Sequence, residues 1–307
     1  MMKHWPAKRR VTVVGAVWNL LLGIGKIVVG VTGQSQALVV DGVHSFSDLI
    51  SDAVVLGAAR WGSIEADHNH QYGHGRIETM AAALVGLLLL GVAAGFLIDA
   101  VGRLLEPERL QQPGWLALGA AVASVVVKEL LFHYTRRVAR QTDSKLIEAN
   151  AWHHRSDALS SVIVIVGVGG VLIGVAWLDS VAAIVVAIMV GWMGWQFIAS
   201  AVVELVDTAI PERERRELEQ IIMAVDGVRK VRNLRTRRMG GRVVMDVTIL
   251  LDPDLSLWKA DVIAAEVRSN LLGQATAVSD VVVGIAAVSD GTADQKDDQK
   301  VDRKSER

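Results

Sequence analysis

The chain has 307 residues, of which 51% are hydrophobic and 5% aromatic, and its formal net charge is −1, with a mean hydropathy of +0.36. This composition is typical of a polytopic membrane protein with a soluble appendage, and the lack of a global basic charge argues against a nucleic-acid-binding protein. The sequence has no cysteine, which excludes disulfides, thiolate metal sites and cysteine nucleophiles, so any metal site has to use histidines and carboxylates.

A basic N-terminus precedes the first apolar run, an order that a secretory signal peptide would share. Lys8, Arg9 and Arg10 lead into the run of residues 11–25, but the run continues to Val31 and no small-residue cleavage site follows. We therefore interpret this segment as a retained membrane span.

Six apolar segments are each close to the ~20 residues that a transmembrane helix needs. They cover residues 11–32, 37–61, 78–104, 114–138, 147–176 and 181–205. Lys and Arg gather in every second connection, which predicts that both termini are cytoplasmic. The expected location is the cell (inner) membrane. Gly91-x-x-x-Gly95 and Gly170-x-x-x-Gly174 indicate either close helix packing or only the general abundance of glycine in membrane helices.

The composition changes at Pro211, where a charged amphipathic helix begins. Apolar alternation then predicts three strands and a second helix. The strands cover residues 228–238, 243–251 and 280–288, and the helix covers 257–272. The order α-β-β-α-β is typical of a small ferredoxin-like domain.

The predicted fold is an α-helical membrane protein with six transmembrane helices and a C-terminal α+β ferredoxin-like cytoplasmic domain. Residues 1–10 form a cytoplasmic N-terminal tail, 11–207 the transmembrane domain and 208–288 the cytoplasmic domain. Residues 289–307 are charged and polar, and we expect a disordered tail there.

One face of the second predicted span carries charged groups. Asp41, His44, Asp48 and Asp52 recur at steps of three and four residues, so a helix presents them together. Each charged group at membrane depth costs about 2.5–3.5 kcal/mol, and a sequence retains such a stripe only against water, a partner or an ion. Asp41 and Asp52 extend the stripe by one turn at each end, where they either guide ions or hold water.

The fifth predicted span contains a second pair at the same spacing. His153 and Asp157 lie on one helical face, as His44 and Asp48 do in the second span. Two packed helices would bring two imidazoles and two carboxylates to one point, a donor set that suits tetrahedral Zn²⁺. The alternative is that each pair is an intrahelical ion pair lining a polar cavity. His154 is expected to face away, either at the interface or behind the ligands.

Polar residues also occur in the first and fourth predicted spans. Lys26 lies within the first span, and Lys128 and Glu129 lie near the predicted cytoplasmic end of the fourth. Snorkelling to the interface explains the pair in the fourth span.

The connection between the second and third spans is rich in metal-binding side chains. Asp67, His68, His70 and His74 lie within eight residues, and nearby glycines let the backbone bend around an ion. Either the connection binds a metal, or it is a hydrated polar loop whose imidazoles only raise the local cation concentration. His68 is the substitute ligand if the loop folds differently.

These features resemble the cation diffusion facilitator family, in which six spans precede a cytoplasmic ferredoxin-like domain. The resemblance extends over residues 8–288 and rests on four motifs. They are His44-x-x-x-Asp48, His153-x-x-x-Asp157, the loop of residues 67–78 and Leu234-Arg235-Thr236-Arg237. The family implies a homodimer in the bilayer that exchanges a divalent metal for protons. It further implies that the transported metal is bound by His44, Asp48, His153 and Asp157. A second, cytoplasm-facing metal site is implied at Asp67, His70 and His74.

His44 makes the chain similar to the zinc-transporting branch of that family, because many bacterial members carry Asp there. Manganese-type members use carboxylate-rich pairs, which this chain lacks. The expected substrate is therefore Zn²⁺, with no cofactor beyond the transported metal. The alternative within the family is a broader exporter of Cd²⁺, Fe²⁺ or Co²⁺.

The C-terminal domain departs from the family pattern. Metal-binding members carry several histidines there, whereas this domain has none and has Arg232, Thr248 and Gly284 in the region where ligands would be expected. No binuclear zinc cluster is expected, and a role in dimerisation is predicted instead. Arg76 and Asp207 match a charge pair that lies at the membrane–domain junction of relatives. The alternative is that each of the two is simply an exposed surface residue.

The predicted mechanism is metal–proton antiport and not enzyme catalysis. Metal binds neutral imidazole and ionised carboxylate, and histidine, with an ordinary pKa of about 6.5, titrates between cytoplasmic and more acidic external pH. An intramembrane metalloenzyme is disfavoured because there is no His-Glu-x-x-His and four ligands would close the site. The lack of a phosphate-binding loop argues against ATP-driven transport. A non-transporting metal-sensing membrane scaffold is the alternative from another class.

Overall fold

The computed structural model describes residues 5–62, 64, 66–110, 112–142, 144–275 and 278–288. The side chain of Asp52 and the predicted tail of residues 289–307 lie outside what is described. The chain divides into two compact units. One contains the residues up to Ala58 together with Met80–Ser200, and the other contains Ala59–Thr79 and the residues from Ala201 onward.

The first unit is built from six long helices, which satisfy their backbone polar groups internally as membrane segments have to. They are α1 (Trp5–Thr32), α2 (Gln36–Gly62), α3 (Arg76–Leu105), α4 (Trp115–Thr142), α5 (Lys145–Leu172) and α6 (Leu178–Leu205). A short 3₁₀ turn, Pro107–Arg109, follows α3. By length and composition, all of the described helices in this list except α2 could cross a membrane. α2 differs because the charged stripe interrupts its apolar sequence. The predicted helical membrane domain is confirmed.

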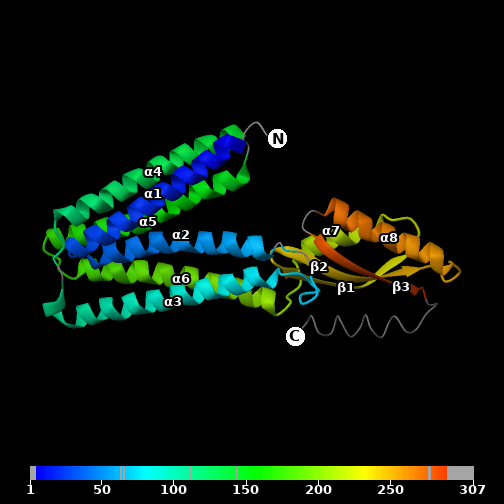
Figure 1. The fold of residues 1–307 in the computed structure, drawn as a ribbon. Coiled ribbons are helices and arrows are strands. Elements are labelled where there is room, and N and C mark those ends of the chain that lie inside the picture. Colours follow the sequence, from blue (N-terminus) through cyan, green and yellow to red (C-terminus); the bar gives the residue numbers. More distant parts are fainter. Residues whose placement is uncertain are drawn as a thin grey trace. The chain divides into compact units, whose positions relative to one another are not determined.

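The helices of the first unit form two groups. In Figure 1, α1, α4 and α5 run together, α2, α3 and α6 run together, and the groups diverge toward the end where α4 is joined to α5. At the opposite end, the Asp179 carboxylate of α6 accepts hydrogen bonds from the Ser35 hydroxyl at 2.6 Å and from the Gln36 N–H at 2.8 Å. An anion is favoured at a helix N-terminus, so Asp179 fixes the start of α2.

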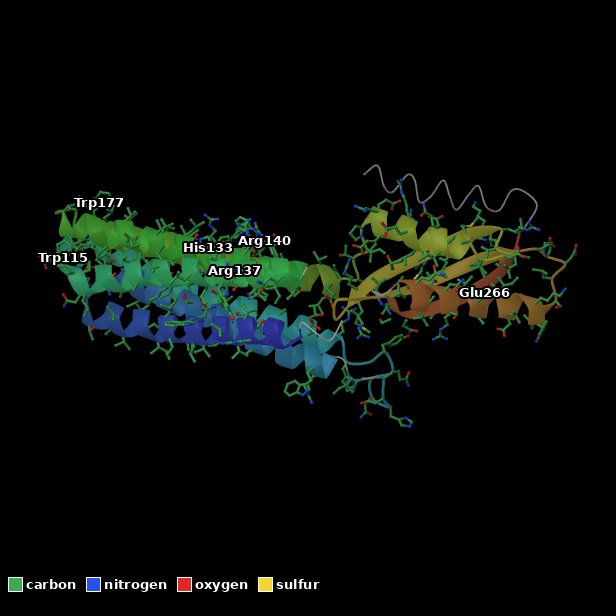
Figure 2. The ribbon with its side chains drawn as sticks, turned by 90° about the horizontal axis from the view of Figure 1, so that it is seen from above. Trp115, His133, Arg137, Arg140, Trp177 and Glu266 are labelled. Carbon is green, nitrogen blue, oxygen red and sulfur yellow. The ribbon has the colours of Figure 1, made fainter. Side chains whose placement is uncertain are left out.

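Aromatic and basic side chains separate along the helices. Figure 2 shows Trp115 and Trp177 at one end, where their side chains are well exposed, and Arg137 and Arg140 farther along toward the other end. Interfacial tryptophans and cytoplasmic arginines are the usual distribution in membrane helices. The arrangement supports a cytoplasmic position for the α4–α5 connection.

α3 and α6 approach each other closely at Gly86 and Gly194. A Cβ atom on Gly86 would lie 2.7 Å from the carbonyl oxygen of Gly194, and one on Gly194 would lie 2.8 Å from that of Gly86. At Gly91 and Gly95, an added Cβ would meet no described atom within 4 Å. Among the described residues, Gly91 and Gly95 therefore do not mark a helix contact, because α3 turns another face to α6.

The second unit contains the domain predicted after Pro211. Its elements are α7 (Glu212–Met223), β1 (Lys230–Met239), β2 (Arg242–Leu251), α8 (Leu257–Gln274) and β3 (Val278–Ala287). β2 is the central strand, antiparallel to β1 and parallel to β3. Both helices cover one face of this sheet (Figure 1). The core between the helices and the sheet includes Ile222, Met245 and Leu271. The predicted α+β fold is confirmed.

Replacing Gly86 with Ala should lower the free energy of unfolding by about 1–3 kcal/mol, because the new methyl group overlaps a backbone that cannot move aside. Denaturant unfolding of the purified protein in detergent measures the change. Gly91→Ala on the same helix is the matched control and should be neutral or slightly stabilising, since it adds a helix-favouring methyl group in open space. Equal destabilisation by both substitutions would contradict the packing described for α3.

Candidate metal centre

The charged face of α2 meets α5 in a buried cluster of ligand side chains. His44, Asp48 and Asp157 are only 6%, 7% and 4% exposed. One donor atom from each lies within 4.8 Å of the other two. In a tetrahedral zinc site with bonds of about 2.0–2.1 Å, neighbouring donor atoms are about 3.4 Å apart. Movements of an ångström or two would therefore let these three side chains share one ion.

The fourth predicted ligand, His153, lies at the edge of this cluster. Its Nδ1 atom is 3.8 Å from Oδ1 of Asp157, but 46% of its side chain is exposed, and it is not among the three converging side chains. On α2, Nδ1 of His44 lies 3.7 Å from Oδ1 of Asp48. Both predicted His–Asp pairs are thus in contact within their own helices, and His153 has to turn inward to complete a set of four donors.

Asp41 is locked in an ion pair. It is fully buried, and its carboxylate lies 2.8 Å from Nζ of Lys26 on α1. Ser160 and Ser161 of α5 donate hydrogen bonds to its two oxygens at 2.6 and 2.8 Å, and Lys26 also donates to Ser45 on α2 at 3.1 Å. The oxygens of Asp41 are therefore already engaged by side chains of two other helices, α1 and α5. Its roles in guiding ions or holding water stay predictions.

Lys128 is also buried, which corrects the prediction that it snorkels to the interface. Its side chain is 0% exposed, and its Nζ lies 3.1 Å from Oδ2 of Asp157. It also donates to Ser45 at 3.5 Å. Its neighbour Glu129 does lie near the surface, in contact with His133 of α4 and Arg155 of α5. The sequence did offer a sign that Lys128 faces inward, because Ser124 lies four residues before it on the same side of the helix. Both residues are fully buried and define a polar face of α4.

His154 of α5 is buried against α1. It is 2% exposed, and its Nε2 lies 3.0 Å from the position that a Cβ atom on Gly15 would occupy. The interfacial position considered for His154 was therefore wrong, because the small residue on α1 makes room for the imidazole inside the helical unit.

A second cluster of ligand side chains forms in the connection between α2 and α3. One donor atom each from Asp67, His70 and His74 lies within 4.8 Å of the others. The Asp67 carboxylate is 3.4 Å from Nδ1 of His70 and 3.5 Å from Nε2 of His74. Asp67 and His70 are about half exposed, whereas His74 is mostly buried. His68, the substitute ligand, is exposed and lies outside the cluster.

Backbone hydrogen bonds hold the Asp67 carboxylate in place. It accepts the N–H of His70 at 2.7 Å and that of Asn69 at 2.8 Å. The hydrogen bond from His70, followed by that from Asn69, lowers the pKa of Asp67, because these bonds favour the ionised form. The loop therefore presents a carboxylate that stays ionised, next to two imidazoles.

The two glycines of this loop have different roles. Gly73 has a φ of +80°, which a bend of this kind requires and which other residues avoid. At Gly75, an added Cβ would lie 3.0 Å from Cγ of Met239 and 3.2 Å from its backbone. Gly73 lets the loop turn, whereas Gly75 lets it pack against the end of β1.

Charged side chains join the start of α3 to the end of α6. The Arg76 guanidinium donates to the Asp207 carboxylate at 2.5 Å and to the Glu204 carbonyl at 3.0 Å. The Glu204 carboxylate accepts the N–H of Gly240 in the β1–β2 turn at 2.7 Å. The predicted pair of Arg76 and Asp207 is therefore formed, and it belongs to a larger network.

The three sheet positions expected to carry ligands in metal-binding relatives lie side by side. Arg232 on β1 is opposite Thr248 on β2, which is opposite Gly284 on β3. These three residues offer a hydroxyl group but no imidazole, carboxylate or thiolate.

Comparison with known families identifies both parts of the chain. Residues 12–206 match the cation efflux transmembrane domain, and residues 210–285 match the cation efflux protein cytoplasmic domain. The chain therefore belongs to the cation efflux family, also called the cation diffusion facilitator family. Its members are divalent-metal transporters and not enzymes, and this chain is an integral membrane protein with a cytoplasmic C-terminal domain.

Similar proteins come from a plant and from bacteria. Metal tolerance protein C1 of Arabidopsis thaliana is 34% identical over 285 residues, which are 88% of this chain but only 60% of the plant protein. Magnetosome protein MamB of Magnetospira sp. is 32% identical, over 88% of this chain and 94% of its own length. Manganese efflux system protein MneP of Bacillus subtilis is 29% identical, over 90% and 95%. A solved MamM CTD structure covers 25% of this chain and 96% of its own, at 26% identity and a TM-score of 0.25.

Removing one partner of the Lys26–Asp41 pair should lower the free energy of unfolding by about 3–5 kcal/mol, because the other charge is left buried and alone. Lys26→Met and Asp41→Leu, singly and together, can be compared by denaturant unfolding in detergent. The double variant should lose less than the sum of the two, because neither charge is stranded. Additive losses would show that the two groups are uncoupled.

Asp67→Ala should abolish the protection of the Asn69 and His70 amides from hydrogen exchange. Because the pKa of Asp67 is lowered in the folded loop, its contribution is complete above the ordinary value of about 3.9 and is lost as pH falls through the lowered value. Wild-type protection should therefore persist from neutral pH to about pH 4 and fade below it. Asp67→Asn keeps one acceptor oxygen and should keep partial protection without the pH dependence. Full protection in Asp67→Ala would refute this account.

Proposed function

We propose that the protein is a metal–proton antiporter that exports Zn²⁺, with His44, Asp48, His153 and Asp157 as ligands of the transported ion. The observation that carries this proposal is the convergence of three buried donor groups from α2 and α5 within 4.8 Å of one another. His153 lies on the same helical face as Asp157 and can supply the fourth donor by turning inward. Two imidazoles and two carboxylates form a set that Zn²⁺ binds tetrahedrally.

The donor chemistry supports zinc over manganese. One similar protein is named for manganese efflux, and others are named for metal tolerance or for the magnetosome. Imidazole suits Zn²⁺, whereas carboxylate, carbonyl and water oxygens suit Mn²⁺. The two histidines of the proposed site therefore favour Zn²⁺, and Cd²⁺, Fe²⁺ and Co²⁺ are the competing substrates.

The same ligands account for coupling to protons. A metal ion needs neutral imidazoles and ionised carboxylates, so protons and metal compete for the site. Exchange follows if metal enters from the cytoplasm and protons enter from the other side. The divergence of the helix groups toward the α4–α5 connection (Figure 1) and the exposure of His153 support a state that is open toward the cytoplasm.

The remaining parts of the chain have supporting roles in the proposal. Asp67, His70 and His74 would form a second metal site on the cytoplasmic side, which their convergence supports. The match to the family's cytoplasmic domain supports a homodimer. The proposed location is the cell (inner) membrane, with both termini in the cytoplasm.

Transport into liposomes containing the purified protein tests the proposal. Zn²⁺ flux, followed with an entrapped fluorescent indicator, should depend on an imposed pH gradient. Asp157→Ala should lower the Zn²⁺ rate by more than about 10-fold, because a ligand is lost. A parallel panel of Cd²⁺, Mn²⁺, Fe²⁺, Co²⁺ and Ni²⁺ measures the preference among ions.

The control variant is Asp246→Ala, which removes an exposed carboxylate from β2 and should transport normally. Wild-type rates in Asp157→Ala would contradict the proposed site. Flux that is indifferent to the pH gradient would contradict the proton coupling. A preference for Mn²⁺ over Zn²⁺ would overturn the proposed substrate but leave divalent-metal transport in place.

A further inference from the structure

We propose that Lys128 is a built-in competitor of the transported metal. Its ammonium group holds Asp157 while the site is empty and has to yield that carboxylate when an ion binds. This inference rests on the proposed transport function and adds to the ligands a residue that sets metal affinity and release.

The geometry places the ammonium group directly on a predicted ligand. Nζ of Lys128 lies 3.1 Å from Oδ2 of Asp157, while Oδ1 of the same carboxylate lies 3.8 Å from Nδ1 of His153. Lys128 also reaches Ser45, the residue that follows His44 on α2. The ammonium group therefore stands between α2 and α5, the two helices that carry the ligands.

Burial prevents Lys128 from leaving this position for solvent. Its side chain is 0% exposed and that of Asp157 is 5% exposed. A buried ammonium group needs a counter-charge or hydrogen-bond acceptors, because its transfer from water is otherwise too costly. In the arrangement described, Asp157 provides that charge and Ser45 provides an acceptor.

A divalent ion changes the balance at Asp157. Two cations that share one carboxylate repel each other, and this repulsion is strong where water is scarce. Either the ammonium group moves off Asp157 toward Ser45, or it stays on Oδ2 and weakens Asp157 as a donor. Both outcomes lower the affinity for metal below that of the ligands alone.

The competition also assists release and return. As the metal leaves, the ammonium group can pair with Asp157 again, so the empty site does not leave a carboxylate uncompensated within the membrane. Lys128 is therefore a positioning residue that lowers the affinity of the site for metal and speeds the release of the ion. Removing its charge should tighten binding and slow the transport cycle.

Lys26 provides a matched comparison for this role. It is a second buried lysine of the same network, but its carboxylate partner is Asp41, which is not among the proposed ligands. Lys26→Gln and Lys128→Gln make the same chemical change at nearly equal burial. Only the second one frees a proposed metal ligand.

The test measures Zn²⁺ affinity and transport rate on the full-length protein. Both are determined in a His70→Ala/His74→Ala background, so that the loop cluster does not contribute. Lys128→Gln should lower the Zn²⁺ dissociation constant by about 10-fold and reduce the maximal rate in liposomes. Lys26→Gln should change the dissociation constant much less than Lys128→Gln does, because its carboxylate partner, Asp41, is not a proposed ligand. Lys128→Arg keeps the charge and pairs bidentately with a carboxylate, so it should bind Zn²⁺ as wild type does or more weakly.

The outcomes separate this inference from the proposed function. If Asp48→Ala abolishes binding but Lys128→Gln binds Zn²⁺ no more tightly than wild type, the competitor role is refuted and the transport site stands. If Asp48→Ala leaves binding unchanged, the proposed site itself is refuted. Tighter binding by Lys128→Arg would also overturn the inference, and it can be measured even if Lys128→Gln fails to fold.

Discussion

A charge inside a bilayer is tolerated only beside an opposite charge, a set of hydrogen-bond partners or a bound ion. In the described helices, four elements meet this requirement together. Lys26 on α1 pairs with Asp41 on α2, and Lys128 on α4 pairs with Asp157 on α5. Serines on α2 and α5 join the pairs through hydrogen bonds. The proposed metal site is therefore one end of a continuous network and not an isolated set of ligands.

This network links the ligands to the arrangement of the helices. Asp41 holds α2 against α1 and α5, and His44 and Asp48 follow it on the same face of α2. Any motion of α2 relative to α1 and α5 has to rearrange the contacts of Asp41. The occupancy of the site and the relative position of the two helix groups are therefore physically connected, which is what a transporter with alternating access requires.

The sequence was informative where a pattern depends on neighbours within one element. The spacing of His44 and Asp48, and the α-β-β-α-β order of the second unit, are local properties of a helix or of consecutive elements. Lys128 was misinterpreted because its place in the sequence indicates depth in the membrane but not which helix it faces. The partner of Asp41 could not be predicted for the same reason, since Lys26 lies on another helix. The contact of Gly86 with Gly194 likewise depends on how two helices are rotated, which the sequence of one helix does not determine.

X-ray absorption spectroscopy at the zinc edge tests the central claim most directly. It would be applied to the Zn²⁺-loaded protein in the His70→Ala/His74→Ala background, where the loop cluster is absent. The account predicts four nitrogen and oxygen neighbours at about 2.0–2.2 Å, with an imidazole signal that weakens when His44 or His153 is replaced. An imidazole signal unchanged by both replacements, or a shell of oxygen neighbours alone, would contradict a site made from α2 and α5.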